Sequence, residues 1–393
     1  MRTVAIVIVL AGCGFETRIP SASGDDAATG DTIAVDGALQ TVACARLALG
    51  SDHSCALRDG QVYCWGSSTF GVRGGGSETT AVGLPAPTVH LASGKYTTCA
   101  VAMDGSVRCW GYNDAGQLGI NVLGGQSTTP VVVMGMAGAV QVGTGRSQAC
   151  ARRANGTVRC WGSNSEGQLG DGSTTTQLTA ATDVMNLTGA VDLALTASHA
   201  CARDAAGNAV CWGSNTYGQL GDGSTTARST PIPAPVNGVS WIGTASFSAD
   251  IAGAHSCAIV SGQVKCWGDN AVGQLGNGST TDSTSPVTAT GISDAVQVVT
   301  GRWHVCARHA TGRVSCWGRN LDGEVGDGTQ NVRSSPVDVG LADVVELGAG
   351  GFHTCAITKS KELYCWGLNS STQLGIATGT RYLTPTKSFA LCP

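Results

Sequence analysis

The chain has 393 residues, a formal net charge of −4 at pH 7 and only 13% charged residues. It contains no run rich in Lys or Arg that could neutralise a phosphate backbone, so we expect no nucleic-acid partner. Its 57 glycines predict many tight turns, and no apolar run beyond the first dozen residues is long enough to cross a bilayer.

The N-terminal residues resemble the export signal of a bacterial lipoprotein. A positively charged start precedes a short apolar run that ends in Leu-Ala-Gly-Cys at residues 10–13. A run this short is typical of a signal-peptide core and too short for a transmembrane helix. Leu-Ala-Gly-Cys is similar to a lipobox, in which the cysteine becomes the lipidated N-terminus, so we expect a signal peptide over residues 1–12 and a lipid on Cys13. The alternative is an ordinary secretory signal with a chance cysteine.

The segment around and after this cysteine predicts a flexible tether. Residues 14–41 are rich in Gly, Ala, Ser, Thr and Asp and contain few large apolar side chains. Such a composition cannot bury enough surface to offset the entropy cost of ordering, so we assign residues 13–41 to a tether. Gly14, in place of Asp, favours the outer membrane in the enterobacterial sorting pattern. We therefore expect an exported lipoprotein whose only contact with the membrane is its lipid.

Residues 42–393 contain a sevenfold internal repeat that predicts an all-β fold. Each unit holds two cysteines around a turn, followed at once by Trp-Gly, as in HSCALRDGQVYCWG at residues 53–66. The first cysteines of successive units are 44, 51, 51, 56, 49 and 49 residues apart. Each unit carries four short, Val-rich runs with alternating apolar residues and Gly or Asp-Gly boundaries, which indicate strands. This pattern predicts a seven-bladed β-propeller of four-stranded antiparallel blades.

Three of the units resemble the repeat of the regulator of chromosome condensation family. They read CWGSNSEGQLGDGSTT at residues 160–175, CWGSNTYGQLGDGSTT at 211–226 and CWGDNAVGQLGNGSTT at 266–281. That family folds as a seven-bladed propeller, and the resemblance implies the same fold for residues 42–393. The first unit departs most from the pattern, with CWGSSTFGVRGGG, and the seventh has Thr372 in place of one glycine.

Fourteen of the 17 cysteines form one pair in each unit, and we expect all seven pairs to be oxidised. In the first unit an Asp-Gly turn at residues 59–60 places Cys55 opposite Cys64 in a non-hydrogen-bonded position, where a disulfide can form. Pairs ten residues apart fit a three-residue loop with a left-handed glycine. Export favours disulfides, whereas reduced and packed cysteines would be the cytosolic alternative. The expected pairs are Cys55–Cys64, Cys99–Cys109, Cys150–Cys160, Cys201–Cys211, Cys257–Cys266, Cys306–Cys316 and Cys355–Cys365.

Two further cysteines predict a covalent closure of the ring. Alignment with an inner unit places Cys44 at the position of Ala139 and Cys392 at the position of Ala137, two residues apart. A disulfide between Cys44 and Cys392 would therefore join the two ends of the propeller. A loop of that length contributes roughly 5 to 6 kcal/mol in the chain-entropy model.

Three repeated residue types are assigned structural roles. We expect the tryptophans after the second cysteines to fill the wedges between blades, and the asparagines just beyond them to hold the next turn through side-chain-to-backbone bonds. Histidines two residues before the first cysteine could suggest a metal ring. Equivalent positions on neighbouring blades, however, lie about 10 Å apart, too far for metal–nitrogen bonds of about 2 Å. We expect structural hydrogen bonds instead from His53, His199, His255, His304 and His353.

The two residues just before the histidine position vary from unit to unit, and these equivalent loops should ring one face. Units six, seven, one, two and three form a contiguous arc that carries Arg, Trp, Phe, Lys and Tyr. Such side chains are typical interface anchors, and loops on a rigid scaffold often bind partners. We predict a protein-binding patch, the alternative being aromatics that are scattered or pack on neighbouring loops. The predicted patch consists of Lys95, Tyr96, Arg146, Arg302, Trp303 and Phe352.

The chain contains no familiar catalytic or phosphate-binding motif, so we predict no enzyme activity, catalytic residue, metal or cofactor. The favoured function is a monomeric, lipid-anchored, extracytoplasmic module that binds an unidentified envelope or secreted protein. The first alternative is a carbohydrate-binding surface protein that uses Tyr96, Trp303 and Phe352 as stacking platforms. The second is a hydrolase or lyase at the central opening, which would need titratable groups converging there.

Overall fold

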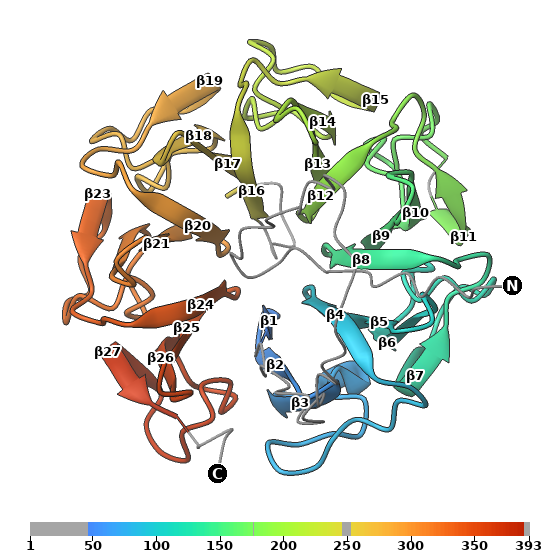
Figure 1. Ribbon diagram of the computed structural model, residues 1–393, viewed down its shortest axis with the longest axis horizontal. Coiled ribbons are helices and arrows are strands. Elements are labelled where there is room, and N and C mark those ends of the chain that lie inside the picture. The colour runs from blue at the N-terminus through green and yellow to red at the C-terminus, as the bar shows by residue number, and fades with distance from the viewer. Residues whose placement is uncertain (1–45, 176, 246–252, 389–393) are drawn as a thin grey trace, which may run out of the picture. The chain divides into compact units, whose positions relative to one another are not determined.

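The computed structural model describes residues 46–175, 177–245 and 253–388, in which nearly all regular structure is β-strand. Seven antiparallel sheets stand around a central axis, and each is built from one continuous stretch of chain (Figure 1). The predicted all-β, seven-bladed propeller is therefore confirmed. Within the described residues, no helix is long and apolar enough to cross a membrane.

The strands of each blade follow one another from the axis outward (Figure 1). The innermost strands are β1 (Arg46–Leu49), β4 (Thr88–Ser93), β8 (Ala139–Thr144), β12 (Ala190–Leu195), β16 (Val239–Ala245), β20 (Ala295–Thr300) and β24 (Val344–Ala349). The second strands are β2 (His53–Arg58), β5 (Thr97–Ala102), β9 (Gln148–Arg153), β13 (His199–Asp204), β17 (His255–Val260), β21 (His304–His309) and β25 (His353–Thr358). The third strands are β3 (Gln61–Gly66), β6 (Val107–Tyr112), β10 (Val158–Ser163), β14 (Ala209–Gly213), β18 (Gln263–Gly268), β22 (Val314–Gly318) and β26 (Leu363–Leu368). The outermost strands are β7 (Gln126–Val132), β11 (Gln177–Asp183), β15 (Arg228–Pro233), β19 (Ser283–Thr288), β23 (Arg333–Asp338) and β27 (Arg381–Lys387).

Six blades have the four strands expected of each, and the first blade has three. The step from its cysteine to the next unit is the shortest in the repeat, at 44 residues. In the other blades the residue equivalent to Val82 directly follows the fourth strand, so in the first blade that strand would run through residues 75–81. A loop stands there instead, after a short 3-10 helix, η1 (Thr69–Gly71), that follows the third strand. In that loop the N–H of Val82 still donates to the carbonyl of Val62 in β3, at 2.7 Å.

The hairpins between second and third strands have the predicted turns. Between β2 and β3, Asp59 and Gly60 have φ values of 50° and 75°, as a two-residue type I′ turn requires. The longer hairpin between β5 and β6 has three loop residues and ends in Gly105, with a φ of 79°. Glycine suits this position because a Cβ is crowded at positive φ. In the seventh blade Lys361 takes the equivalent position, with a φ of 64°.

The hydrophobic core is divided into seven clusters, each shared by two neighbouring blades. In one cluster Val101 of the second blade packs with Trp161 of the third. In another, Ile357 of the seventh blade packs with Trp65 of the first. Because apolar surface is buried between blades as well as within them, the first and last blades hold each other in place.

Candidate functional site

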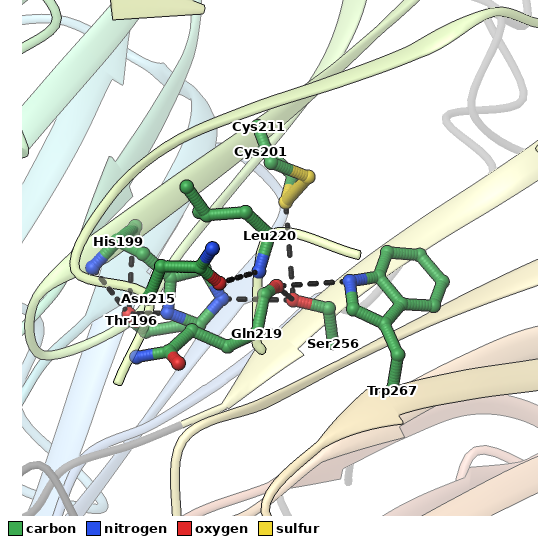
Figure 2. The surroundings of a disulfide bond; sticks show 9 residues. All are labelled: Thr196, His199, Cys201, Cys211, Asn215, Gln219, Leu220, Ser256 and Trp267. Carbon is green, nitrogen blue, oxygen red and sulfur yellow. Dashed lines mark hydrogen bonds between the residues drawn. A yellow bond between two sulfur atoms is a disulfide. The ribbon is translucent and has the colours of Figure 1, made fainter. Parts of the chain in front are cut away.

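Neighbouring blades are joined by a set of hydrogen bonds, which Figure 2 shows between the fourth and fifth blades. The indole Nε1 of Trp267 donates to the backbone carbonyl of Gln219 in the preceding blade at 2.9 Å. The hydroxyl of Ser256 donates to the same carbonyl at 3.0 Å. The Nε2 atom of His199 lies 2.8 Å from that hydroxyl. Because the Ser256 hydroxyl donates its only hydrogen to the carbonyl, it accepts from the Nε2–H group of His199.

The same joint recurs around the ring. All seven tryptophans that follow the second cysteines donate from Nε1 to a carbonyl of the preceding blade, at 2.8 to 3.0 Å. Three further histidine–hydroxyl pairs lie at 2.8 to 2.9 Å, namely His53–Thr98, His304–Thr354 and His353–Ser54. The last of these pairs joins the seventh blade to the first. The joint therefore also closes the ring.

Where the histidine–hydroxyl pair is missing between two blades, one or both of its residues are replaced. The fifth blade has His255, but the sixth has Val305 where the hydroxyl would stand, and the Nε2 atom of His255 has no partner in the described structure. The third blade has Gln148 at the histidine position, and its amide donates to the carbonyl of Thr196 in the next blade at 2.7 Å. The histidine and the hydroxyl of the following blade thus act as one pair.

Burial keeps these five histidines neutral. Each is no more than 1% exposed, and removal from water lowers the pKa of His53 and His255 to about 4. The same cause lowers the pKa of His199, His304 and His353 to about 3. No group of three or more metal-ligating side chains occurs in the part of the chain that the structure describes. Four of these histidines hold neighbouring blades together through hydrogen bonds, whereas His255 bonds through Nδ1 to the carbonyl of Gly253 in its own blade at 2.7 Å.

The repeated asparagines hold the loop after the third strand, as expected. The Oδ1 atom of Asn215 accepts from the N–H of Leu220 at 2.9 Å, and its Nδ2 donates to the carbonyl of Thr226 at 3.1 Å. Gly221 in the same loop has a φ of 76°, and a Cβ there would lie 2.8 Å from the indole nitrogen of Trp267. The Gln-Leu-Gly motif therefore supplies a carbonyl acceptor, a buried leucine and the space for the tryptophan of the next blade.

Every cysteine pair predicted within a blade forms a disulfide. The Cα–Cα distances of 4.0 to 4.1 Å are those of directly opposed residues in a non-hydrogen-bonded pair. All fourteen cysteines are fully buried. Cys13, Cys44 and Cys392 lie outside the described residues, so the lipid and the closing disulfide stay predictions.

The described loops between innermost and second strands lie at one end of the ring, which we call the inner-loop face. Backbone hydrogen bonds join neighbouring loops at two places: the N–H of Lys95 donates to the carbonyl of Gly145 at 3.2 Å, and the N–H of Gly351 donates to the carbonyl of Gly50 at 3.0 Å. A Cβ on Gly94 would lie only 2.0 Å from the carbonyl oxygen of Gly145. Glycine is required at this position because the backbones approach so closely. The variable residues that follow are presented on a rigid frame.

The sixth and seventh blades carry the first cluster on this face, the arginine–tryptophan cluster (Arg302, Trp303, Arg319 and Phe352). The guanidinium carbon of Arg302 lies 3.7 Å from the Trp303 ring centroid and 5.2 Å from that of Phe352. The two rings meet edge to face at 6.1 Å. Arg319 approaches the same rings at 5.5 and 5.1 Å. All four side chains are half-buried, an arrangement in which cation–π contacts stabilise the group.

A buried acid orients one of these arginines. Glu324, which is 1% exposed, replaces the glutamine found in five of the other units and pairs with the Arg319 guanidinium. The same guanidinium bonds to Asp322 at 2.9 Å. Burial raises the pKa of Glu324 to about 7, although the positive charge of Arg319 acts in the opposite direction. The two acids hold Arg319 against the aromatic rings.

The first and second blades carry the second cluster, the tyrosine cluster (Phe70, Lys95, Tyr96 and Tyr112). The centroid of the Phe70 ring lies 5.0 Å from that of Tyr96 and 4.5 Å from that of Tyr112. The ammonium of Lys95 lies 4.7 Å from the Tyr96 centroid. The hydroxyl of Tyr112 donates to the exposed carboxylate of Asp114. Three rings from two blades therefore form one half-buried surface.

A pocket of about 210 Å³ opens beside the tyrosine cluster. Asp52 stands in its lining, and burial raises the pKa of this carboxyl against the effects of a hydrogen bond from Ser51 and of the charges of Lys95 and Arg302. One cation from each cluster, Lys95 and Arg302, thus acts to lower the pKa of the Asp52 carboxyl. The pocket is lined by Asp52, His53, Ser67, Thr69, Phe70, Val72, Lys95, Tyr96 and Ser371.

The structure divides the predicted patch into two parts. Arg302, Trp303 and Phe352 meet in one cluster, and Lys95 and Tyr96 meet in the other. The sixth patch residue, Arg146, lies half-buried in the loop of the third blade. All six side chains are half-buried, and rings pack on their neighbours, as the alternative interpretation expected. Binding by this patch stays a prediction.

Sequence reasoning missed four residues of these clusters and the pocket. Tyr112 and Arg319 directly follow Cys-Trp-Gly, at a position that varies between units, and this variation could have located them. Phe70 lies in the irregular loop of the first blade, where no repeated pattern marks it. Asp52 occupies one of the variable loop positions but was not included in the predicted patch.

Comparison with known families finds two models with the same description, "Regulator of chromosome condensation (RCC1) repeat". One matches residues 44–72, 89–117, 139–168, 190–219, 295–324 and 344–373. The other matches residues 207–259, 261–308 and 311–357. Together the two models match more than half of the chain, and each of the seven blades is matched.

Individual proteins are similar over part of their length. The ultraviolet-B receptor UVR8 of Arabidopsis thaliana is 31% identical over 277 residues, which are 66% of this chain and 61% of the receptor. The probable E3 ubiquitin-protein ligase HERC6 of Homo sapiens is 31% identical over 227 residues, which are 55% of this chain and 22% of the ligase. This chain therefore spans less than two thirds of both relatives. Among solved structures, Prp20p of Saccharomyces cerevisiae has a TM-score of 0.70 at 21% identity, covers 87% of each chain and shares the fold.

Proposed function

Because the chain belongs to the regulator of chromosome condensation repeat family, we propose that its propeller is a non-catalytic module that binds a partner protein through the inner-loop face. Proteins of the same fold support this proposal, since Prp20p is described by its binding to Gsp1p and histones. Those partners belong to Prp20p, and the ligase activity of HERC6 belongs to a protein of which this chain spans 22%. What carries over is the binding of a protein by a propeller.

The pair of aromatic–cation clusters on the inner-loop face carries the proposal. Most positions on this face are occupied by glycines and repeated residues that hold the ring together, whereas the clusters occupy positions that vary. Trp, Tyr and Arg are enriched among the residues that contribute most to binding. The fourth blade presents Ala197 and Ser198 at the same positions. The partner should therefore cover blades six, seven, one and two.

Capture on immobilised protein tests this assignment. Purified protein is incubated with envelope and secreted proteins of the source organism, in parallel with a variant in which Tyr96, Trp303 and Phe352 are changed to Ala. A matched control changes Val191, Val296 and Val345 to Ala, because these side chains are 36 to 44% exposed but lie near the opposite ends of the innermost strands. We expect a specific protein to be retained by the wild type and the control and lost by the first variant. Equal retention by all three would refute the inner-loop face as the interface.

We also propose that the protein acts outside the cytoplasm as a lipoprotein of the outer membrane. The proposal rests on the lipobox-like residues 10–13, and the seven disulfides support an oxidising compartment. Mass spectrometry of the mature N-terminus should find a diacylglyceryl group on Cys13. Cys13→Ser should release the protein from the membrane fraction, and an unmodified N-terminus at another residue would refute the lipid anchor.

A further inference from the structure

The pocket beside the tyrosine cluster has the size and shape of a site for one small ring. Its volume of about 210 Å³ is below the range of roughly 300 to 1,000 Å³ that is usual for drug-sized ligands. Phe70, Val72 and Tyr96 are the apolar side chains of its lining. The rings of Phe70 and Tyr96 pack edge to face on each other, with centroids 5.0 Å apart and an interplanar angle of 64°.

The polar side chains of the pocket include one that accepts hydrogen bonds, one that donates them and three that do both. The ionised carboxylate of Asp52 can only accept, and the ammonium of Lys95 can only donate. The hydroxyls of Ser67, Thr69 and Ser371 can do both. One negative and one positive side chain line the pocket, so a charged ligand of either sign would meet a like charge.

The geometry points to a neutral polyhydroxylated ligand, a single sugar ring, as the occupant of this pocket. Adjacent sugar hydroxyls both donate and accept, which matches the carboxylate, the ammonium and the three hydroxyls. The C–H face of the ring packs against Phe70 and Tyr96. A partner's lysine would meet Lys95 as well as Asp52, and a partner's carboxylate would meet Asp52 as well as Lys95, so neither charge gains a net attraction from the pair.

This inference goes beyond the proposed protein interface and can fail independently of it. The sugar pocket is lined by the first and second blades and by Ser371 of the seventh, whereas no residue of the arginine–tryptophan cluster lines it. Because Tyr96 lines the pocket, a capture variant that changes Trp303 and Phe352 alone separates the two proposals, and its loss of protein capture says nothing about the pocket. Loss of sugar binding on changing Asp52 likewise leaves the arginine–tryptophan cluster intact.

Titration of the intact protein with defined sugars tests the inference. The probes are glucose, galactose, mannose and N-acetylglucosamine, each alone and as oligomers of two to four units. Binding is measured by saturation-transfer NMR and calorimetry. We expect at least one neutral sugar to bind with a dissociation constant on the order of 1 mM, as suits one ring in a small pocket. Glucosamine and glucuronate, which are positively and negatively charged at pH 7, should bind at least tenfold more weakly than glucose.

Matched variants locate the binding. Asp52→Asn keeps the shape of the side chain and should weaken sugar binding at least tenfold, and Phe70→Ala should do the same by removing an apolar side chain from the lining. Asp114→Asn changes a carboxylate on the same face that does not line the pocket, and it should leave binding unchanged. Absence of binding by every neutral sugar, tighter binding of a charged sugar, or equal affinity of wild type and Asp52→Asn would each overturn the proposal.

Discussion

Lowering the pH from 7.5 to 5.5 should destabilise the folded protein through its buried histidines. The pKa of His53 and His255 is about 4 and that of His199, His304 and His353 about 3, against 6.5 in an unfolded chain. Between these values the unfolded chain binds protons that the folded protein cannot bind. The free energy of unfolding therefore falls as the pH drops below 6.5, and it continues to fall until the folded pKa is reached.

The magnitude follows from the difference between the two pKa values. At pH 5.5 each such histidine lowers the free energy of unfolding by about 1.4 kcal/mol, and five lower it by about 7 kcal/mol. Glu324 acts in the opposite direction, because burial raises its pKa to about 7 and the folded protein takes up its proton first. This adds about 2 kcal/mol at pH 5.5. His90, with its pKa lowered by burial, and Glu346, with its pKa raised by burial, oppose each other.

The expected net loss of about 5 kcal/mol is large beside a usual stability of about 5 to 15 kcal/mol. Guanidinium unfolding with intact disulfides, followed by tryptophan fluorescence at pH 7.5, 6.5 and 5.5, measures this loss. His304→Gln removes one titrating group and introduces the residue that the third blade already has at Gln148. The variant should lose about 1.4 kcal/mol less than the wild type over the same range. Identical pH dependence of the two proteins would refute the reasoning, as would NMR titration of these histidines between pH 5.5 and 7.5.

Three comparisons by the same guanidinium assay test the packing between blades, the hydrogen bonds between blades and the disulfide within one blade. Gly221→Ala should cost about 2 to 4 kcal/mol, because its Cβ would meet Trp267, whereas Gly223→Ala should cost about 1 kcal/mol, since its φ is 80° but nothing lies within 4 Å; equal losses would contradict the packing argument. Trp267→Phe should cost about 1 kcal/mol by removing the indole's hydrogen bond to the Gln219 carbonyl, which keeps its bond from Ser256, and no loss would show that the indole bond is unimportant. Joint replacement of Cys201 and Cys211 by Ala should lower stability by about 2.5 to 3 kcal/mol, and an unchanged midpoint would mean that the disulfide does not constrain the unfolded chain.

The regular part of the fold could be predicted from the sequence because it depends on neighbours along the chain. Asp59-Gly60 determines a two-residue turn, and that turn alone places Cys55 opposite Cys64. Alternating apolar residues on both sides of the turn then indicate which strand faces are buried. Seven copies of this hairpin predict seven blades, so both the disulfides and the propeller could be predicted from the sequence.

For the joints between blades, the sequence predicted that the histidines make structural hydrogen bonds but not which residues they bond to. The sequence shows His199 in one unit and Ser256 in the next, but 57 residues separate them. Their meeting depends on how far each blade is rotated about the axis, which is a property of the assembled ring. The same holds for His353 and Ser54, which are 299 residues apart and meet only because the ring closes.

The repeat by itself determined the strands, the turns, the cysteine pairs and the number of blades, because each of these follows from local patterns repeated seven times. Tertiary structure alone decided that Phe70 and Tyr112 would join Tyr96, that Arg319 would lie against Trp303, and that Asp52 would line a pocket. These residues come from separate segments of one blade or of neighbouring blades, and no local pattern relates them. Their surfaces exist because the closed ring holds the ends of neighbouring blades in contact.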